Sequence, residues 1–269
     1  MLVDMYGRTI DYLRISVTDR CNFRCIYCMP LEGVEWKPHE DILRYEEITQ
    51  IVLVAAELGI RKVRITGGEP LARKRIESLI KAISSIPEIE ETTMTTNGSL
   101  ITREKAAALK AAGLTRVNIS LDTLNPDKFK TITRLGSIDD VVQGIKEAVA
   151  AGLTPVKVNM VVFEDTTTDE IEQMKSFCAQ TGATLQTISR FSLHNRAERE
   201  PVHTDRPPRC TECNRLRLTA DGYFKSCLFS DKEQKVNFDD IAGSIGAAVS
   251  AKPKNGEFCR SRTMSQIGG

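Results

Sequence analysis

The feature that most constrains the fold is an alternation of apolar and polar residues in short segments along the first 190 residues. Six segments are predicted to be strands: residues 12–17, 62–66, 92–96, 116–121, 156–162 and 184–189. In the first of them, Leu13 and Ile15 alternate with Arg14 and Ser16. Because successive side chains of a strand point to opposite faces, strands of this kind have one apolar and one polar face.

Amphipathic helices are predicted between these strands. Apolar residues recur at helical spacing over positions 48–55, 138–149 and 171–178, and Thr102 is a suitable cap for an Ala-rich helix that ends at Gly113. Repeated strand–helix units predict a parallel sheet with right-handed crossovers. Strands of an open sheet covered by helices on both faces would be apolar throughout. The pattern therefore favours a barrel-like curl with a polar, ligand-holding interior, and the alternative is a polar face in contact with solvent.

The last third of the chain has a different character. Residues 186–209 contain few apolar residues and many Arg, His and Pro residues, which predicts a linker or mobile loop. Asp221-Gly222 lies between two short alternating runs and predicts a hairpin, a helix is expected within 238–251, and the tail Met264–Gly269 is expected to be flexible. Three parts are predicted: a barrel over 1–190, a linker over 191–209 and a C-terminal region over 210–269.

Charge and cysteine content narrow the class of function. Basic residues number 37 and acidic residues 36, so no excess of positive charge steers the whole molecule toward nucleic acid. No segment has the length and apolar character of a membrane span or a signal peptide, and a cytoplasmic protein is predicted. Six of the eight cysteines fall in two tight triplets, a pattern that favours metal binding over disulfides.

The first triplet follows the first strand and reads Cys21-Asn-Phe-Arg-Cys25-Ile-Tyr-Cys28. Three thiolates this close together can ligate three irons of a [4Fe–4S] cluster. The fourth iron then has no protein ligand, and an open metal position is what catalysis requires. The alternative is a zinc site, for which His39 is the nearest histidine.

The second triplet consists of Cys210, Cys213 and Cys227. It again supplies three thiolates and favours a second [4Fe–4S] cluster with an open iron that binds substrate. The alternative is a zinc ribbon completed by Cys259 or His203.

The first triplet, with an aromatic residue before its last cysteine, resembles the signature of the radical S-adenosylmethionine (SAM) superfamily. Three further segments match this superfamily at strand ends: Thr66-Gly67-Gly68-Glu69-Pro70, Thr95-Thr96-Asn97-Gly98 and Ser120-Leu121-Asp122. The resemblance implies a partial TIM-like (β/α)6 barrel with a small C-terminal iron–sulfur extension. It also implies that SAM binds the open iron and is cleaved to a 5′-deoxyadenosyl radical. The positions that correspond to SAM-facing residues are Tyr27, Gly67, Gly68, Glu69 and Ser120.

Further motifs are similar to those of the molybdenum-cofactor GTP 3′,8-cyclase (MoaA) family. They are Tyr12–Arg20, Cys213-Asn-Arg215-Leu-Arg217, Cys227-Leu-Phe and the terminal Ile267-Gly268-Gly269. In that family the radical abstracts hydrogen from C3′ of GTP, the product is 3′,8-cyclo-7,8-dihydro-GTP, and the second cluster binds guanine. The resemblance implies substrate-binding roles for Arg14, Arg64, Thr95, Lys157, Arg215, Arg217, Gly268 and Gly269, and catalytic roles for Arg14, Arg215 and Arg217. It also implies an electron donor such as flavodoxin or ferredoxin, and a downstream cyclic pyranopterin synthase.

The chain departs from this family at three places. It is several tens of residues shorter, with the loss expected between about 190 and 209. Thr187–Arg190 replaces a segment with a SAM-contacting methionine, and Arg75 replaces the usual aspartate. Two alternatives therefore stay open: a two-cluster radical SAM enzyme for another nucleotide or a peptide, and an iron–sulfur electron carrier without catalysis.

Overall fold

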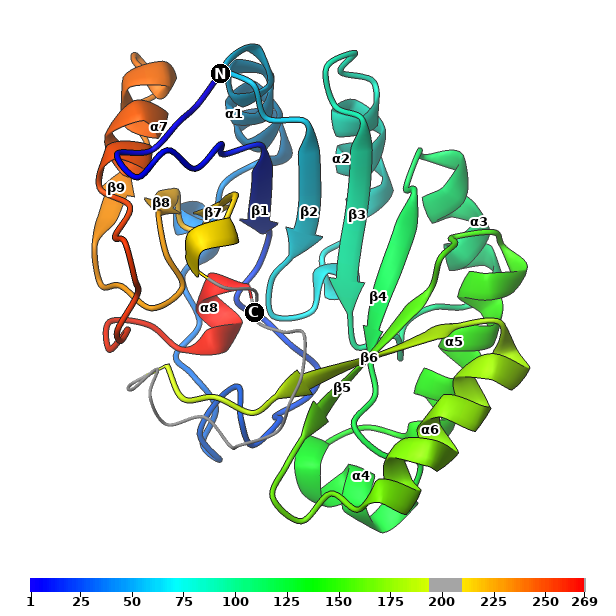
Figure 1. Ribbon diagram of the computed structural model, residues 1–269. Coiled ribbons are helices and arrows are strands. Elements are labelled where there is room, and N and C mark those ends of the chain that lie inside the picture. The colour runs from blue at the N-terminus through cyan, green and yellow to red at the C-terminus, as the bar shows by residue number, and fades with distance from the viewer. Residues whose placement is uncertain (194–209, 269) are drawn as a thin grey trace.

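A single nine-stranded sheet organises the chain in the computed structural model, which describes residues 1–193 and 210–268 (Figure 1). Its strands are β1 (Tyr12–Ser16), β2 (Lys62–Thr66), β3 (Glu91–Thr96), β4 (Arg116–Ser120), β5 (Lys157–Val162), β6 (Thr184–Ser189), β7 (Arg215–Leu218), β8 (Tyr223–Lys225) and β9 (Glu233–Lys235). The order across the sheet is β6-β5-β4-β3-β2-β1-β7-β8-β9. Strands β1 to β7 are parallel, and β7, β8 and β9 pair antiparallel. All six strands predicted for the first 190 residues are confirmed.

Helices follow most of the parallel strands. They are α1 (Tyr45–Glu57), α2 (Ile76–Ser84), α3 (Arg103–Ala111), α4 (Pro126–Thr133), α5 (Ile138–Ala150), α6 (Thr168–Thr181), α7 (Ile241–Ser250) and the short α8 (Met264–Ile267). Thr102 caps α3 as predicted, since its hydroxyl accepts a hydrogen bond from the Lys105 N–H at 3.1 Å. The α/β class and the parallel sheet are confirmed. With β6 and β9 as its edges, the partial barrel of the described residues is not closed by backbone hydrogen bonds.

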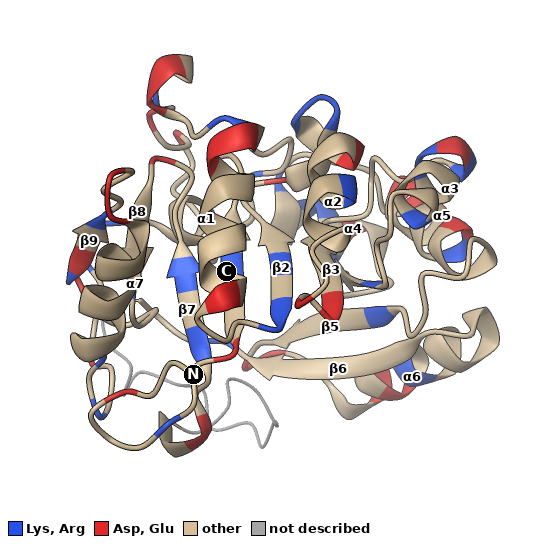
Figure 2. Ribbon diagram, turned by 90° about the horizontal axis from the view of Figure 1, so that it is seen from above, with Lys and Arg blue, Asp and Glu red and all other residues tan. Residues whose placement is uncertain are grey.

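The apolar face of the sheet forms the main core with the helices. Leu13 and Ile15 of β1, Val63 and Ile65 of β2 and Met94 of β3 are fully buried there. Burial of such side chains stabilises the fold by about 1.5–3 kcal/mol each. The polar residues of the same strands face the other side, where Arg14 and Arg64 line a pocket. Figure 2 shows where Lys and Arg occur along β2, β5 and β7.

The C-terminal region extends the barrel sheet. Strand β7 pairs with β1 along its length, and Leu216 and Leu218 join the core of the first six strands. The predicted hairpin at Asp221-Gly222 and the helix within 238–251 are confirmed as β7–β8 and α7. Most of the predicted linker, 194–209, lies outside the described residues.

The expectation of a flexible tail is wrong. Residues 264–267 form α8, whose first turn is closed by a capping box in which the Thr263 N–H donates to Gln266 Oε1 at 3.0 Å. Met264 and Ile267 are buried in a second apolar cluster with Phe229 and Leu193. The spacing of Met264 and Ile267 was a local signal for a helix. Their packing partners are distant in sequence, so a local pattern does not reveal that the helix is buried. Among the described residues, no helix is long and apolar enough to cross a bilayer.

Two glycines inside helices provide a matched test of packing. A Cβ at Gly144 in α5 would overlap the Gly98 carbonyl, whereas a Cβ at Gly246 in α7 would meet no atom within 4 Å. Ala favours helix over Gly by about 0.5–1 kcal/mol, but overpacking costs about 1–3 kcal/mol. We expect Gly144→Ala to lower the free energy of unfolding by about 1–2 kcal/mol and Gly246→Ala to raise it, as measured by urea denaturation. Equal effects of the two substitutions would contradict this packing.

Candidate functional site

Two adjoining pockets lie at the polar face, the first toward the C-terminal ends of the parallel strands and the second nearer their N-terminal ends. The first is lined by Cys21, Cys25, Cys28, Tyr27 and residues 66–69, together with Ser120 and Asp122. The second is lined by Tyr12, Arg14, Arg64, Lys157, Arg215 and Arg217. Thr95, Asn159, Ile188 and Phe191 line both. The polar face therefore holds two adjoining pockets, with thiols lining the first and cations lining the second.

The first cysteine triplet lies on a loop after β1 that the rest of the fold holds in place. Arg134 donates from Nη1 to the carbonyls of Arg24 and Met29, each at 3.1 Å, and Phe23 packs edge-on against Phe129. Burial, with smaller contributions from Cys21 and Asp122, raises the pKa of Cys28 to about 12. As free thiols these groups stay protonated at neutral pH, so metal binding has to release their protons.

The donor set of this loop fits an iron–sulfur cluster better than zinc. His39, the alternative fourth ligand, is exposed and does not line the cavity. Residues 1–193 and 210–268 contain no three His, Cys, Asp or Glu side chains grouped around a position for one ion. Thiolates that each ligate a different iron of a cluster do not need to meet at one ion.

Gly68 allows the end of β2 to approach the cysteine loop. Its N–H donates to the Thr18 carbonyl at 2.6 Å, and the Glu69 N–H donates to the Arg20 carbonyl at 2.8 Å. A Cβ at Gly68 would overlap the Arg20 carbonyl, so only glycine fits between these segments.

Glu69 is buried and binds the ends of two strands together. Its Oε1 accepts from the Leu71 N–H at 2.9 Å and the Thr96 hydroxyl at 2.7 Å, and its Oε2 accepts from the Asn97 N–H at 2.7 Å. Burial raises the pKa of Glu69 to about 7 against these hydrogen bonds. A carboxylate has about four acceptor positions, so one remains for a donor in the cavity.

Asp122 fixes the side chain of Tyr27. The Tyr27 hydroxyl donates to Asp122 Oδ2 at 2.8 Å, and Oδ1 accepts from the Val161 N–H at 2.8 Å. Burial raises the pKa of Asp122 to about 6. The sequence indicated Asp122 only as the end of a strand motif, and its role in orienting Tyr27 was not predicted.

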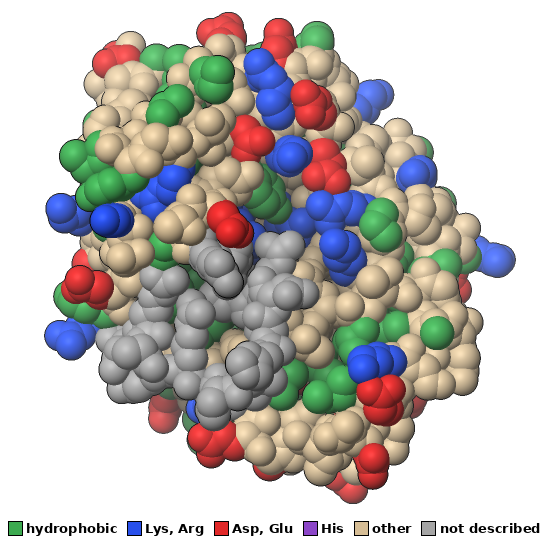
Figure 3. All heavy atoms as spheres, in the orientation of Figure 1, with side chains coloured by type: hydrophobic (Ala, Val, Ile, Leu, Met, Phe, Trp, Pro, Cys, Tyr) green, Lys and Arg blue, Asp and Glu red, His purple; other side chains and the backbone are tan. Residues whose placement is uncertain are grey.

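Three arginines form a row across adjacent strands at the other end of the cavity. Arg14 of β1 is in register with Arg64 of β2 and with Arg217 of β7, and all three are buried. Burial and the neighbouring Arg215 lower the pKa of Arg217 to about 10, and burial and Arg217 lower the pKa of Arg14. Figure 3 shows Lys and Arg side chains gathered at a hollow in this face. A bound anion would offset this repulsion.

Tyr12 and Arg64 show how this end of the cavity is built. The Cζ atoms of Arg64 and Arg215 each lie 5.8 Å from the centroid of the Tyr12 ring, which separates the two cations. Arg64 Nη1 donates to the Thr95 hydroxyl at 3.1 Å, and its buried Nε has no hydrogen-bond partner among the described residues. An unsatisfied buried donor of this kind fits an absent anionic ligand. Sequence reasoning missed Tyr12, although it occupies a polar-face position of β1.

The second triplet lies beside this row. Cys213 lies two residues before β7, and Cys227 lies two residues after β8. The Cys213 N–H donates to the Cys210 carbonyl at 3.3 Å. Burial raises the pKa of Cys213, but Lys252 and the Arg215 N–H outweigh it, and the net pKa is lowered. The three cysteines do not line the two pockets themselves, whereas Arg215, Arg217 and Leu228 next to them do.

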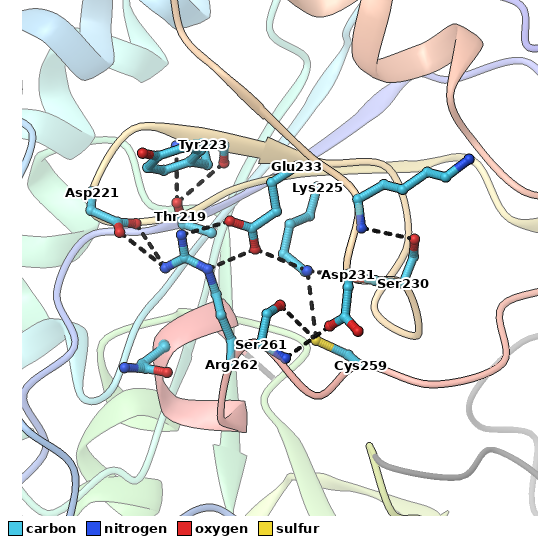
Figure 4. Close-up of polar contacts among 12 residues, drawn as sticks. Thr219, Asp221, Tyr223, Lys225, Ser230, Asp231, Glu233, Cys259, Ser261 and Arg262 are labelled. Carbon is cyan, nitrogen blue, oxygen red and sulfur yellow. Dashed lines mark hydrogen bonds and ion pairs between the residues drawn. The ribbon is translucent and has the colours of Figure 1, made fainter.

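Cys259 belongs to a different cluster of polar contacts (Figure 4). It is fully buried, and Lys225 Nζ lies 3.6 Å from its sulfur. Arg262 is held by Glu233 at 2.6 and 2.8 Å and by Asp221 at 2.9 Å. These contacts anchor the segment before α8. Cys259, one candidate for the fourth zinc ligand of the second triplet, thus has Lys225 as a neighbour in this cluster. The other candidate, His203, lies outside the described residues.

The anchored segment carries the C-terminal residues into the cavity. Met264 and Ser265 line the first pocket, and the Gly268 carbonyl accepts from Arg217 Nη1 at 2.8 Å. Gly268 has a φ of +74°, and a Cβ there would overlap the Thr66 hydroxyl. Gly269 lies outside the described residues.

The segments that depart from the family pattern also have defined places. Ser189 and Arg190 line the first pocket, and the Arg190 Cζ lies 5.7 Å from the Phe163 ring centroid. Arg75 is exposed at the N-cap of α2 with a φ of 60° and makes no side-chain cap there. Asn118 and Gln186, which the sequence analysis did not select, line the second pocket.

Comparisons with known proteins agree with this arrangement. The radical SAM superfamily matches residues 15–178. The chain is 42% identical to a GTP 3′,8-cyclase of Petrotoga mobilis, with 100% of each protein covered, and 41% identical to one of Peptoclostridium acidaminophilum, with 100% and 98% covered. The first alignment spans 326 positions against 269 residues here, so the predicted shortening is confirmed.

Solved structures show the same fold at low identity. Streptococcus suis SuiB bound to S-adenosylmethionine superposes with a TM-score of 0.66 at 18% identity, over 84% of this chain and 63% of that one. The protein anSMEcpe with bound AdoMet gives 0.68 at 15% identity, over 91% and 81%. Both carry the α/β arrangement described above.

The raised pKa of Glu69 predicts a pH dependence of stability. The folded protein retains a proton on Glu69 that the unfolded chain loses near pH 4.5, so stability is full below that pH and falls as pH rises toward 7. We expect the cluster-free protein to lose on the order of 3 kcal/mol between pH 4.5 and 7.5 through this group. Urea denaturation of Glu69→Gln should show a weaker loss, with Asp122 accounting for part of the remainder. Glu77→Gln, at an ion-paired surface carboxylate, is the control, and an unchanged slope in Glu69→Gln would contradict the assignment.

Proposed function

The chain belongs to the radical SAM superfamily and to its GTP 3′,8-cyclase family, and on this premise we propose that it cyclises GTP to 3′,8-cyclo-7,8-dihydro-GTP in molybdenum cofactor biosynthesis. The structural observation that carries the proposal is a pair of adjoining pockets, one lined by the cysteine loop and the other by buried arginines. Relatives that match over their full length favour this function over another substrate or a simple electron carrier.

The thiol end of the cavity would hold the cofactors. Cys21, Cys25 and Cys28 would be the ligands for a [4Fe–4S] cluster, and Gly67, Gly68 and Ser120 line the space beside them. Bound there, the cluster and SAM supply the 5′-deoxyadenosyl radical that starts the reaction. Glu69 offers an acceptor position to the SAM ammonium, and Asp122 holds Tyr27 in the wall.

The cationic end would bind the nucleotide. Arg14, Arg64 and Arg217 lie side by side, and Lys157 and Thr95 line the same pocket. Guanidinium groups in a row suit the oxygens of a triphosphate. The Gly268 carbonyl holds one Arg217 nitrogen, which fixes the direction of that side chain.

The second triplet would hold a second [4Fe–4S] cluster through Cys210, Cys213 and Cys227. The nearby Arg215 and Arg217 connect this site with the nucleotide pocket. Partners of the enzyme follow from the family alone: a flavodoxin or ferredoxin as electron donor and a cyclic pyranopterin synthase that uses the product. A cytoplasmic location belongs to the same proposal.

The proposal predicts a GTP-dependent product. Reconstituted protein incubated with SAM, GTP and a strong reductant should yield 5′-deoxyadenosine and a cyclised nucleotide, both quantified by liquid chromatography and mass spectrometry. Replacing GTP by ATP is the control for the base. Cleavage of SAM without any nucleotide product would rule out this substrate.

The two cysteine triplets should have separable effects. Cys25→Ala removes a ligand of the first cluster and should reduce SAM cleavage to background. Cys213→Ala should leave uncoupled SAM cleavage largely intact and remove the cyclised product, because it lies in the other triplet. Cys178→Ala, at a buried cysteine of α6 outside both triplets, is the control. Equal loss of SAM cleavage in Cys25→Ala and Cys213→Ala would contradict separate roles for the two triplets.

A further inference from the structure

The short segment Lys252–Lys254 after α7 contacts the backbone beside Cys213 and Cys227, and Arg8 joins the same segment to Cys210. We propose that Lys252 and Arg8 are positioning residues for the second cluster: both hold its ligand segments together, and Lys252 also sets the charge beside it. The inference rests on the proposed function, because it takes Cys210, Cys213 and Cys227 as cluster ligands.

Lys252 joins the start of β7 to the end of β8, at the open end of their hairpin. Its side chain is buried, and Nζ donates to the Arg215 carbonyl and to the Ser226 carbonyl, each at 2.7 Å. Arg215 lies two residues after Cys213, and Ser226 directly precedes Cys227. One ammonium group thus fixes the separation of the backbone segments that bear two of the three thiols.

Arg8 joins the remaining cysteine to the same segment. Its Nη1 donates to the Cys210 carbonyl at 2.7 Å and to the Lys254 carbonyl at 3.1 Å, and its Nη2 donates to the Pro253 carbonyl at 2.7 Å. Asp4 orients the guanidinium through an ion pair of 2.6 Å from Arg8 Nε to Asp4 Oδ2. Residues far apart in sequence therefore converge on the backbone around the triplet.

The two cations differ in how their charge is balanced. Arg8 is paired with the buried carboxylate of Asp4. Lys252 forms no ion pair with a carboxylate among residues 1–193 and 210–268. The acidic groups that interact electrostatically with its ammonium are the thiols of Cys213 and Cys227. A buried ammonium requires a compensating negative charge, which thiolates bound to a cluster provide.

This difference separates the expected effects. A positive charge near an iron–sulfur cluster stabilises its reduced form, which carries one more negative charge. Lys252 should therefore raise the reduction potential of the second cluster. Arg8, already neutralised by Asp4, should act on cluster retention and leave the potential nearly unchanged.

The test uses the full chain with both clusters reconstituted under anaerobic conditions. Iron and sulfide are counted, and a redox titration followed by electron paramagnetic resonance reports each cluster. Lys252→Met should move the second cluster to a more negative potential and leave the first unchanged, and Lys252→Arg should restore most of the difference. Lys254→Met is the matched control, because its exposed side chain lies on the same segment and only its carbonyl is used.

Arg8→Ala should reduce iron from about eight to about four per chain and retain the first cluster and SAM cleavage. About eight irons and unchanged potentials in Arg8→Ala and Lys252→Met would overturn the inference and leave the proposed function standing. Equal loss of both clusters in Arg8→Ala would also overturn it, since Arg8 would then serve the fold in general. About four irons in the unaltered protein would instead remove the second cluster, and the inference with it.

Discussion

The pairing of β1 with β2 on one side and β7 on the other is the constraint on which the rest of the structure depends. A parallel register fixes which side chains are neighbours, and a shift by one residue would move each of them to the opposite face. In the observed register Arg14 lies between Arg64 and Arg217, while Leu13 lies between Val63 and Leu216. The same pairing therefore closes the apolar core and brings the buried cations together.

Burial and polar contacts act against each other at both ends of the cavity. Glu69 gains three hydrogen bonds but loses contact with water, and the loss is the larger effect on its pKa. Arg14 and Arg217 are similarly removed from water and repel each other. Sites that keep ionisable groups under such conditions are typical of ligand binding, because a ligand of opposite charge relieves the cost.

The strands, the cysteine loop and the polar face could be predicted because their signals are local. Alternation at period two located β1 to β6, and the positions of Arg14, Arg64 and Lys157 on the polar face followed from the same pattern. Strand β7 pairs with a strand some two hundred residues earlier, and no local pattern specifies that partner. The tail was wrongly expected to be flexible because Met264 and Ile267 are buried only by distant residues such as Leu193 and Phe229. The roles of Asp122 and Tyr12 were missed because they depend on neighbours from distant parts of the chain.

The separation in sequence between Arg8 and its partners has a consequence for how the protein matures. Arg8 reaches across 202 residues to Cys210 and across 245 residues to Pro253. The loop of the first triplet, by contrast, is supported by Phe129 and Arg134. In a chain synthesised from its N-terminus, the residues that support the first cysteine loop are present long before Pro253 and Lys254, the partners of Arg8. The backbone contacts that support the second triplet are therefore the last of the two sets to form.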